Sequence, residues 1–509
     1  MNLKKIYLPA FYCLLGFFGV SSCSSPVPDI SSKMIGFDTE VDSLMNLYHT
    51  VGVSVAIIKD GEIAYSNGFG YSDLENSTPA TANTVYGIAS CSKSFTASLF
   101  GILASNDQLK LTDMPKQHIP SLKFYNTEMN QQIQLRHILS HSTGLPNVST
   151  ESSAVLFRSE NKNDIIPRLQ YLAPQAGVEE EWIYNNYMYA LAGRITEHIT
   201  QQSWQENLSE YIFDPLEMSS SFGNVAPASK HPAFALGYGV RRNDTTITRV
   251  LKEDFPTRDA GGNIYSSVND MTRWLRLWLN EGQLQGEEFL PKEYVNAAMG
   301  EQHLISTDSL TNESRYYGYG WMRSRQEGHL KIEHSGGISG YTSNMVFFPE
   351  DDIGIVVLSN QNTAGIAFAL TNNLITRMLD IEIAPHPNEP YFSTVIEIED
   401  PSKNTVIQED NPPTHSLDQF TGSFFRQGFG TINVTYDDGT LYAEFPFTTF
   451  RLEHQENNTF IDYFTERKSQ VMGNFLTFDF QANSEEIIDR LLLNIDIEPV
   501  PFQKKEKGL

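Results

Sequence analysis

The sequence predicts an α+β protein, in which an antiparallel sheet with flanking helices and an all-α lobe precedes a small all-β C-terminal barrel. Two segments read as hairpins: residues 53–65, with Asp60-Gly61 at the turn, and residues 345–358. The chain between them has mostly helical periodicity, and residues 363–380 are expected to form a closing helix. Strands from both ends around a helical middle predict one sheet, with the functional site at its boundary with the lobe.

The C-terminal part of the chain has a different character. Residues 381–414 contain several prolines and acidic residues with little periodicity, which predicts a linker. Short alternating segments return in residues 415–509, with Asp438-Gly439 at one turn, and predict a small barrel. Aromatic residues recur along it, and they are more typical of a core than of a ligand site: Phe420, Phe424, Phe429, Tyr442, Phe445 and Phe450.

The amino terminus predicts export and a lipid anchor. Two lysines precede a short apolar stretch, residues 6–20, which is typical of a signal peptide rather than of a membrane span. The following Val20-Ser21-Ser22-Cys23 resembles a bacterial lipobox and implies lipid on the Cys23 sulfur. Residues 1–23 are thus expected to be a lipoprotein signal peptide and residues 24–33 a tether, with an ordinary signal peptide as the alternative. The expected location is the bacterial cell envelope, facing the periplasm or the exterior.

Charge and cysteine content exclude several classes of partner. The formal net charge of −26 argues against nucleic acid, whose recognition needs a basic footprint. Only Cys91 remains in the mature chain if Cys13 is removed with the signal and Cys23 is acylated, so no disulfide is expected. The sequence has no zinc-ligand spacing and no phosphate-binding glycine loop, so neither a metal nor a cofactor is expected. The oligomeric state stays open.

The stretch Ser90-Cys91-Ser92-Lys93 is the most informative in the chain. Small residues precede it and an apolar helical run follows, so Ser90 is expected to open a helix. Positions three apart share a helix face, which places the Lys93 ammonium beside the Ser90 hydroxyl, where a neutral or strongly paired lysine takes the serine proton. The alternative is an N-cap serine followed by a solvent-exposed lysine. Cys91 is expected to point inward rather than to take part in catalysis.

Two further segments carry residues suited to the same chemistry. Tyr184 and Asn186 lie two apart, so in an extended segment their side chains face the same way. A phenol beside a lysine can carry a proton, and an amide can hold a substrate carbonyl. His334-Ser335-Gly336-Gly337 leads into a strand-like run, and its glycines indicate an edge strand where a substrate approaches the main chain. The alternatives are a buried tyrosine, a turn asparagine and a flexible loop.

Together, these Ser-x-x-Lys, Tyr-x-Asn and His-x-Gly segments resemble the motif set of the serine β-lactamase-related hydrolases. That family includes class C β-lactamases, D-aminopeptidases, DD-peptidases and esterases. The resemblance covers residues 34–380 and implies a β-lactamase/transpeptidase-like fold. Supporting segments follow in the family's order: residues 135–146, 189–193, 260–267 and 319–321. Residues 417–424 resemble the start of lipocalin-like C-terminal domains found in some relatives, including archaeal D-peptidases.

The resemblance assigns a role to each matching residue. It implies that Ser90 is the acylated nucleophile, that Lys93 lowers its proton affinity, and that Tyr184 acts as general base and then general acid. Asn186 would bind the amide or acyl oxygen of the substrate. The backbone N–H groups of Ser90 and Gly337 would form the oxyanion hole.

Two positions depart from the family pattern. His334 stands where β-lactamases and penicillin-binding proteins usually carry the Lys of Lys-Thr-Gly. A histidine, with an unperturbed pKa near ~6.5, is a poorer fixed cation for a β-lactam carboxylate, so peptidase or esterase activity is favoured over antibiotic hydrolysis. Ser335 and Gly336, beside it, are expected to contact substrate. Asn185 replaces the more common Ser of Tyr-Ser-Asn, and the sequence offers no reason for the change.

The expected function is therefore that of an extracytoplasmic serine hydrolase. It would act through an acyl-enzyme on amide or ester bonds of small molecules or short peptides, including peptides with D-residues. One alternative is a true β-lactamase. Another is a binding or sensor protein that captures peptidoglycan fragments or is acylated once without turnover. The expected partners are the substrate and, through the lipid anchor, a membrane.

Overall fold

The structure is a computed structural model of the whole chain. It describes residues 27–146, 161–240, 245–250, 259–309, 312–361, 365–383, 410–446, 448–464, 476–495 and 499–505. The predicted signal peptide and Cys23 lie outside the described residues, as does most of the predicted linker. Among the described helices, none is both long and apolar enough to cross a membrane.

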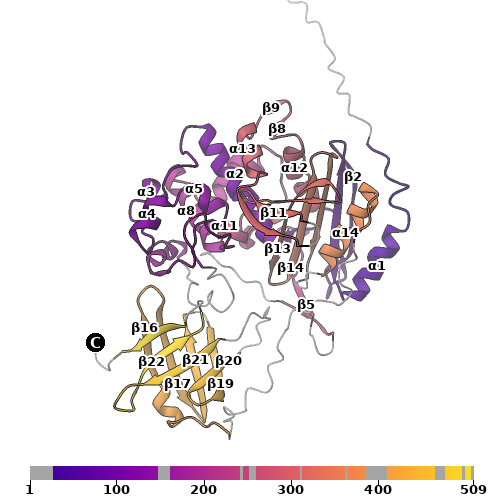
Figure 1. Cartoon of the computed structure of the whole chain (residues 1–509). Coiled ribbons are helices and arrows are strands. Elements are labelled where there is room, and N and C mark those ends of the chain that lie inside the picture. The colour runs from indigo at the N-terminus through magenta and orange to yellow at the C-terminus, as the bar shows by residue number, and fades with distance from the viewer. Residues whose placement is uncertain are drawn as a thin grey trace, which may run out of the picture.

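A nine-stranded antiparallel sheet forms the centre of the first part of the chain (Figure 1). Its strand order is β10-β11-β12-β13-β14-β15-β1-β2-β3. The first strand of this part, β1, therefore pairs with its last strand, β15. The strands are β1 (Gly52–Lys59), β2 (Glu62–Asp73), β3 (Thr78–Pro79), β10 (His303–Thr307), β11 (Ser314–Tyr317), β12 (Met322–Gln326), β13 (His329–Ile338), β14 (Tyr341–Phe348) and β15 (Ile353–Ser359).

Both faces of the central strands are buried, which explains their nearly continuous apolar sequences. On β15, Ile355 and Val357 pack in a cluster with the helices α1 (Phe37–Leu47) and α14 (Gly365–Leu379). The alternate residues Val356 and Leu358 face the opposite cluster, which contains the buried Trp274 of α12 (Val268–Leu279). The sheet is therefore a middle layer between two groups of helices.

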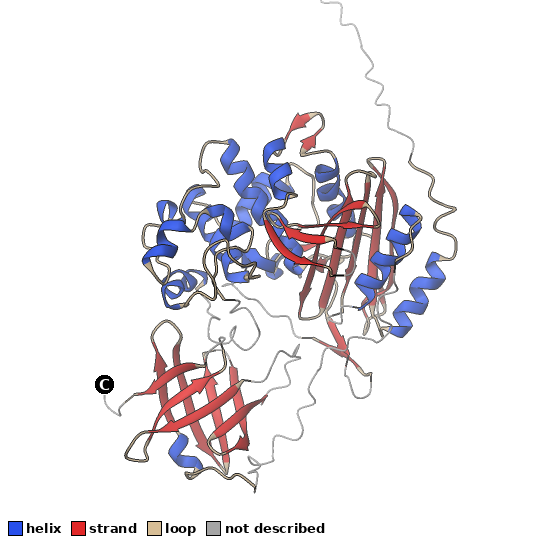
Figure 2. Ribbon diagram, viewed as in Figure 1, coloured by secondary structure: helices blue, strands red, loops and turns tan. Residues whose placement is uncertain are grey.

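The helical lobe lies on the α12 side of the sheet, and Figure 2 shows its helices gathered away from α1 and α14. The described residues also form three short two-stranded ribbons: β4 (Tyr86–Gly87) with β7 (Tyr265–Ser266), β5 (Tyr238–Val240) with β6 (Ile247–Arg249), and β8 (Gln283–Leu284) with β9 (Glu287–Glu288). The other α-helices in the described residues are α2 (Ser92–Ser105), α3 (Pro115–His118), α4 (Thr127–Gln132), α5 (Leu135–Leu139), α7 (Ile165–Arg168), α8 (Asn186–Thr200), α9 (Trp204–Leu208), α10 (Val225–Ala228), α11 (Asp259–Gly262) and α13 (Lys292–Ala298).

The C-terminal part is a closed eight-stranded antiparallel barrel (Figure 1). It closes where β16 pairs with both β17 and β23, and its interior is filled by apolar side chains such as Phe424, Leu452 and Phe480. The strands are β16 (Gly422–Arg426), β17 (Gly430–Asp437), β18 (Thr440–Phe445), β19 (Thr448–Glu456), β20 (Thr459–Phe464), β21 (Thr477–Ala482), β22 (Ile488–Leu493) and β23 (Val500–Lys504).

The predicted fold class is confirmed, and the turn residues show why. Asp60 and Gly61 have φ values of 51° and 75°, and Asp438 and Gly439 have values of 42° and 83°. Two successive positive φ angles are the signature of the type I′ hairpin turns that Asp-Gly favours. The aromatic residues of the C-terminal part mostly fill the barrel core as expected, because Phe420, Phe424, Phe445 and Phe450 are buried.

Candidate active site

Ser90 lies in a short 3₁₀ turn, Ala89–Cys91, immediately before α2. The expectation that Ser90 opens the α-helix was therefore wrong by two residues, because α2 begins at Ser92. Ala89 has a φ of 48° although it is not glycine, and it is fully buried. Such left-handed backbone costs free energy and is typical of residues beside an active centre. The turn presents the Ser90 hydroxyl at the start of a helix whose next residues are all buried.

Lys93 is fully buried and makes three hydrogen bonds through Nζ. Nζ lies 3.0 Å from Ser90 Oγ, 2.6 Å from Asn186 Oδ1 and 2.7 Å from the carbonyl oxygen of Gly261. An ammonium group has three N–H donors, so three acceptors suit its charged form. The alternative of a solvent-exposed lysine after an N-cap serine is excluded by this burial.

Tyr184 approaches Ser90 from the side of α8. Its hydroxyl donates to Ser90 Oγ at 2.9 Å, and the Lys93 Nζ lies 4.8 Å from the centre of its ring. Burial raises the pKa of the Tyr184 phenol above its ordinary value. The resting site thus holds a neutral phenol and an ammonium group, both donating to the same serine oxygen.

Asn186 and its neighbour Asn185 begin α8. Asn186 is the first residue of the helix and accepts from Lys93, so Tyr184 and Asn186 both face the Ser90–Lys93 pair, as their spacing predicts. Asn185 is the helix N-cap: its Oδ1 accepts from the backbone N–H of Tyr187 at 2.9 Å, and its Nδ2 donates to the carbonyl of Pro146 at 2.8 Å. The amide thus caps the helix and also ties it to the loop after α5, a bond that the usual serine is too short to make in the same way.

Replacing Asn185 tests this role. We expect Asn185→Ala to lower the free energy of unfolding by about 1–2 kcal/mol, because the cap is lost and the Pro146 carbonyl loses its buried donor. Asn185→Ser keeps the cap and should lose clearly less. Urea unfolding of both variants measures the difference, and equal losses would show that the cap contributes nothing.

The glycines of β13 allow the strand to run beside the nucleophile. A Cβ atom built on Gly336 would lie 2.4 Å from the carbonyl oxygen of Ile88 and 2.8 Å from the backbone nitrogen of Ser90. A Cβ on Gly337 would meet no atom within 4 Å, and this residue is exposed. In the sheet, β13 lies between β12 and β14. Its pairing with β12 ends at Glu333, however, and residues 334–338 pair only with β14. The expected edge strand is therefore an inner strand, of which residues 334–338 alone form an edge of the sheet.

His334 is almost fully buried. Its Nδ1 lies 2.7 Å from the carbonyl of Ser335, and its Nε2 lies 3.0 Å from the hydroxyl of Tyr317. Burial, and then the charge of Lys93, lower the pKa of His334 to about 3. A carbonyl requires a donor, so the neutral ring carries its proton on Nδ1 and accepts from Tyr317 on Nε2.

The protonation of His334 has a measurable consequence. Its imidazole signals in histidine-labelled protein should not titrate between pH 8 and 5, with His334→Gln used to assign them. Because the folded pKa lies below the unfolded value, the stabilisation is complete above pH ~6.5 and is lost as pH falls toward the folded pKa. A titration midpoint near pH 6.5 would contradict the buried neutral histidine.

Cys91 is buried, as its position beside Ser90 on the chain predicts. Its Sγ lies 3.2 Å from the carbonyl of His334 and 3.2 Å from Ser343 Oγ. Burial raises the pKa of the Cys91 thiol to about 12, so the group is a thiol at neutral pH. Within the described residues, no group of three or more His, Cys, Asp or Glu side chains is arranged to hold a metal ion.

The structure thus brings Ser90, Lys93, Tyr184 and Asn186 into one hydrogen-bonded group, with Gly336 against the backbone of Ser90. Sequence reasoning missed two contributors. The Gly261 carbonyl that holds Lys93 comes from the predicted 260–267 segment, but a backbone acceptor has no sequence signal. Tyr317, the partner of His334, lies just before the 319–321 segment and carries no motif of its own.

A serine, a lysine and a tyrosine meeting between an antiparallel sheet and a helical lobe define the class of β-lactamase/transpeptidase-like serine hydrolases. The sequence pattern of the Beta-lactamase family matches residues 37–375, so the chain belongs to that family. Residues 408–507 match a domain of unknown function, DUF3471. This second match falls on the barrel.

Several known proteins have similar sequences. The chain is 27% identical over 363 residues to "Protein flp" of Staphylococcus aureus (strain MW2), which covers 71% of this chain and 68% of that protein. In other strains of that species the match covers as little as 62% of the relative. It is 26% identical over 459 residues to an unguisins hydrolase of Aspergillus violaceofuscus, covering 82% of this chain and 80% of that protein.

A solved structure has a similar fold. The octameric penicillin-binding protein homologue from Pyrococcus abyssi superposes with a TM-score of 0.59 at 22% identity, covering 93% of this chain and all of that one. At this identity the likeness concerns the fold alone. Family, relatives and fold together support a β-lactamase-related serine hydrolase.

Proposed function

We propose that this protein hydrolyses amide or ester bonds of small molecules or short peptides through an acyl-enzyme on Ser90. The observation that carries the proposal is the convergence of two donors, Lys93 Nζ and the Tyr184 hydroxyl, on Ser90 Oγ. Donors aimed at a serine oxygen stabilise the alkoxide that forms as its proton leaves, and so make the hydroxyl a better nucleophile. The backbone N–H groups of Ser90 and Gly337 would stabilise the oxyanion of the substrate, since β13 runs against Ser90 at Gly336.

The raised pKa of Tyr184 favours a relay over a resting phenolate. As Ser90 Oγ attacks the carbonyl, its proton passes to the Tyr184 oxygen, and the phenolic proton passes to the leaving nitrogen or oxygen. In the second half a water gives its proton to the Tyr184 oxygen, the Tyr184 proton returns to Ser90, and the acid product leaves. Lys93 stays an ammonium throughout and holds Asn186 in place to receive a substrate oxygen.

The state of His334 supports neutral acyl substrates over β-lactams. Its ring is neutral and bonded to Tyr317 and to the Ser335 carbonyl, so it offers no fixed positive charge to a substrate carboxylate. Peptides, including those with D-residues, and simple esters are the proposed substrates. One relative carries the name of an unguisins hydrolase, which agrees with hydrolysis but does not set this chain's substrate.

The test is turnover by the purified mature protein without its lipid anchor. The panel contains a chromogenic short-chain ester, D-amino-acid amides, a D-Ala-D-Ala peptide and a chromogenic cephalosporin, with Ser90→Ala as the control. We expect ester or amide turnover that vanishes in Ser90→Ala and little cephalosporin hydrolysis. A stoichiometric burst without turnover would contradict the hydrolase and favour a sensor protein that is acylated once. Preferred cephalosporin turnover would make the protein a β-lactamase and overturn the argument from His334.

We further propose that the protein is held in the cell envelope by lipid on Cys23, facing the periplasm or the exterior. The support is the lipobox-like sequence before that residue. Labelling with radioactive palmitate in a bacterial host should mark the wild type and not Cys23→Ala. Equal labelling of both proteins would contradict a lipid anchor on Cys23.

A further inference from the structure

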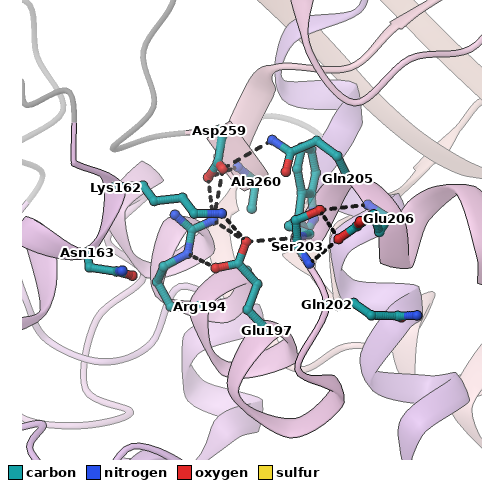
Figure 3. Close-up of polar contacts among 12 residues, drawn as sticks. Lys162, Asn163, Arg194, Glu197, Gln202, Ser203, Gln205, Glu206, Asp259 and Ala260 are labelled. Atoms are coloured by element: carbon teal, nitrogen blue, oxygen red, sulfur yellow. Dashed lines mark hydrogen bonds and ion pairs between the residues drawn. The ribbon is translucent and has the colours of Figure 1, made fainter.

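A buried ion pair joins α8 to α11 behind the active site. The side chain of Arg194 is fully buried and that of Asp259 is 3% exposed. Arg194 Nη2 lies 3.0 and 2.8 Å from the two carboxylate oxygens of Asp259, and its Nε lies 3.0 Å from Glu197 Oε2 (Figure 3). The Asp259 carboxylate also accepts from the backbone N–H of Ala260 at 2.7 Å. The pair therefore fixes the first two residues of α11.

The α11 turn holds α2 through two successive carbonyl oxygens. That of Gly261 accepts from Lys93 at 2.7 Å, and that of Ala260 accepts from Thr96 Oγ1 at 2.7 Å. Gly193, beside Arg194 on α8, packs so closely on the turn that an added Cβ would lie 2.5 Å from Ala260 Cβ. A shift of α11 along α8 would therefore move the carbonyl that holds the catalytic lysine.

We propose that Arg194 and Asp259 are positioning residues, which set the Gly261 carbonyl and through it aim the Lys93 ammonium at Ser90. The inference rests on the proposed roles of Ser90 and Lys93. A buried ion pair contributes little net stability compared with apolar side chains of similar volume, because desolvation offsets the attraction. It does constrain position, because Arg194 Nη2 contacts both carboxylate oxygens of Asp259 while Nε lies against Glu197 of the same helix, so α11 is tied to one place along α8. Such a constraint suits an ion pair that holds α11 in place on α8.

The decisive variant removes both charges of the pair, and Glu197 keeps its ion pair with Lys162. In Arg194→Met with Asp259→Leu, we expect kcat to fall by roughly 10- to 100-fold with KM within about threefold, because a misplaced catalytic group slows the chemical step. The alkaline limb of the pH profile of kcat should also move, because Lys93 acts as an ammonium group and would lose one of its acceptors. The thermal midpoint should stay close to that of the wild type. Arg377→Met with Glu40→Leu is the control, since that ion pair joins α14 to α1 on the other face of the sheet.

A crystal structure of the double variant separates this inference from the proposed function. We expect the 2.7 Å contact between Lys93 Nζ and the Gly261 carbonyl to be broken. An intact contact, or an unchanged kcat with the contact broken, would overturn the inference. If the wild type shows no turnover dependent on Ser90, the proposed function fails, and the crystal contact still decides whether the pair positions Lys93. Should the double variant not fold, Asp259→Glu, which keeps the charge and displaces the turn, undergoes both measurements.

Discussion

Gly336→Ala is expected to lower kcat/KM by about 100-fold or more, the loss typical of removing an oxyanion-hole donor. The new methyl group would lie 2.4 Å from the Ile88 carbonyl and 2.8 Å from the Ser90 nitrogen. Both atoms belong to the backbone, so no side chain can rotate away to make room. Either β13 must move outward or the turn holding Ser90 must move. Steady-state kinetics on the preferred ester or amide measures the effect.

Gly337→Ala is the matched comparison on the same strand. Its added methyl group meets no atom within 4 Å, and the variant keeps the N–H group proposed to bind the oxyanion. We expect its loss of kcat/KM to be at least ~10-fold smaller than that of Gly336→Ala, since the donor remains. Both proteins should melt as single folded species. Equal losses at the two positions would show that the close approach of β13 to Ser90 does not govern catalysis.

Tyr184→Phe is expected to lower kcat by about 10²- to 10⁴-fold, the usual contribution of one positioned acid–base group. The substitution removes the hydroxyl that lies 2.9 Å from Ser90 Oγ and leaves the ring in its contact with His141, whose centroid is 4.4 Å away. KM should change little, because the phenol acts on the proton rather than on substrate binding. Rapid-quench measurement of the acyl-enzyme would show that both acylation and deacylation are slowed.

Tyr189→Phe provides the control for the loss of a buried phenol. Its hydroxyl donates to the carbonyl of Leu139 at 2.6 Å, and burial raises its pKa as it does that of Tyr184. This variant loses a buried hydrogen bond but no contact to Ser90, so kcat should stay within about threefold of the wild type while stability falls by about 1 kcal/mol. If Tyr184→Phe were no slower than Tyr189→Phe, the proton relay through Tyr184 would be wrong.

Local chemistry explains which parts of the fold were predictable. The Asp-Gly turns at Asp60 and Asp438 adopt the paired positive φ angles that such turns favour, and they locate hairpins in both the sheet and the barrel. The strands β10, β11 and β12 escaped prediction because their residues are largely half-exposed and polar, as in Arg323 and Arg325. Such strands follow from pairing with β13, which is a long-range contact without a local sequence signal.

The side chains proposed to be catalytic were predictable from spacing, whereas their supports were not. Ser90 and Lys93 lie three apart across the 3₁₀ turn and the start of α2, and Tyr184 and Asn186 lie on either side of the extended Asn185, so the spacing brought each pair together. The support from Ala89 depends on a positive backbone φ angle, which the sequence does not reveal. The Gly261 carbonyl and the Tyr317 hydroxyl come from segments that are distant in sequence from the residues they support. Asn185 lies between two motif residues, but its role as a helix cap could be assigned only once the start of α8 was known.

Covalent labelling of Ser90 tests the central claim most directly. The purified protein is treated with a fluorophosphonate, which transfers a phosphonyl group to an activated serine oxygen and releases fluoride. Intact and peptide mass spectra then locate the adduct. Lys93 and Tyr184 both donate to Ser90 Oγ, so the account predicts one adduct on Ser90 that is absent from Ser90→Ala and formed much more slowly in Tyr184→Phe. Labelling that persists in Ser90→Ala, or that proceeds equally fast in Tyr184→Phe, would contradict it.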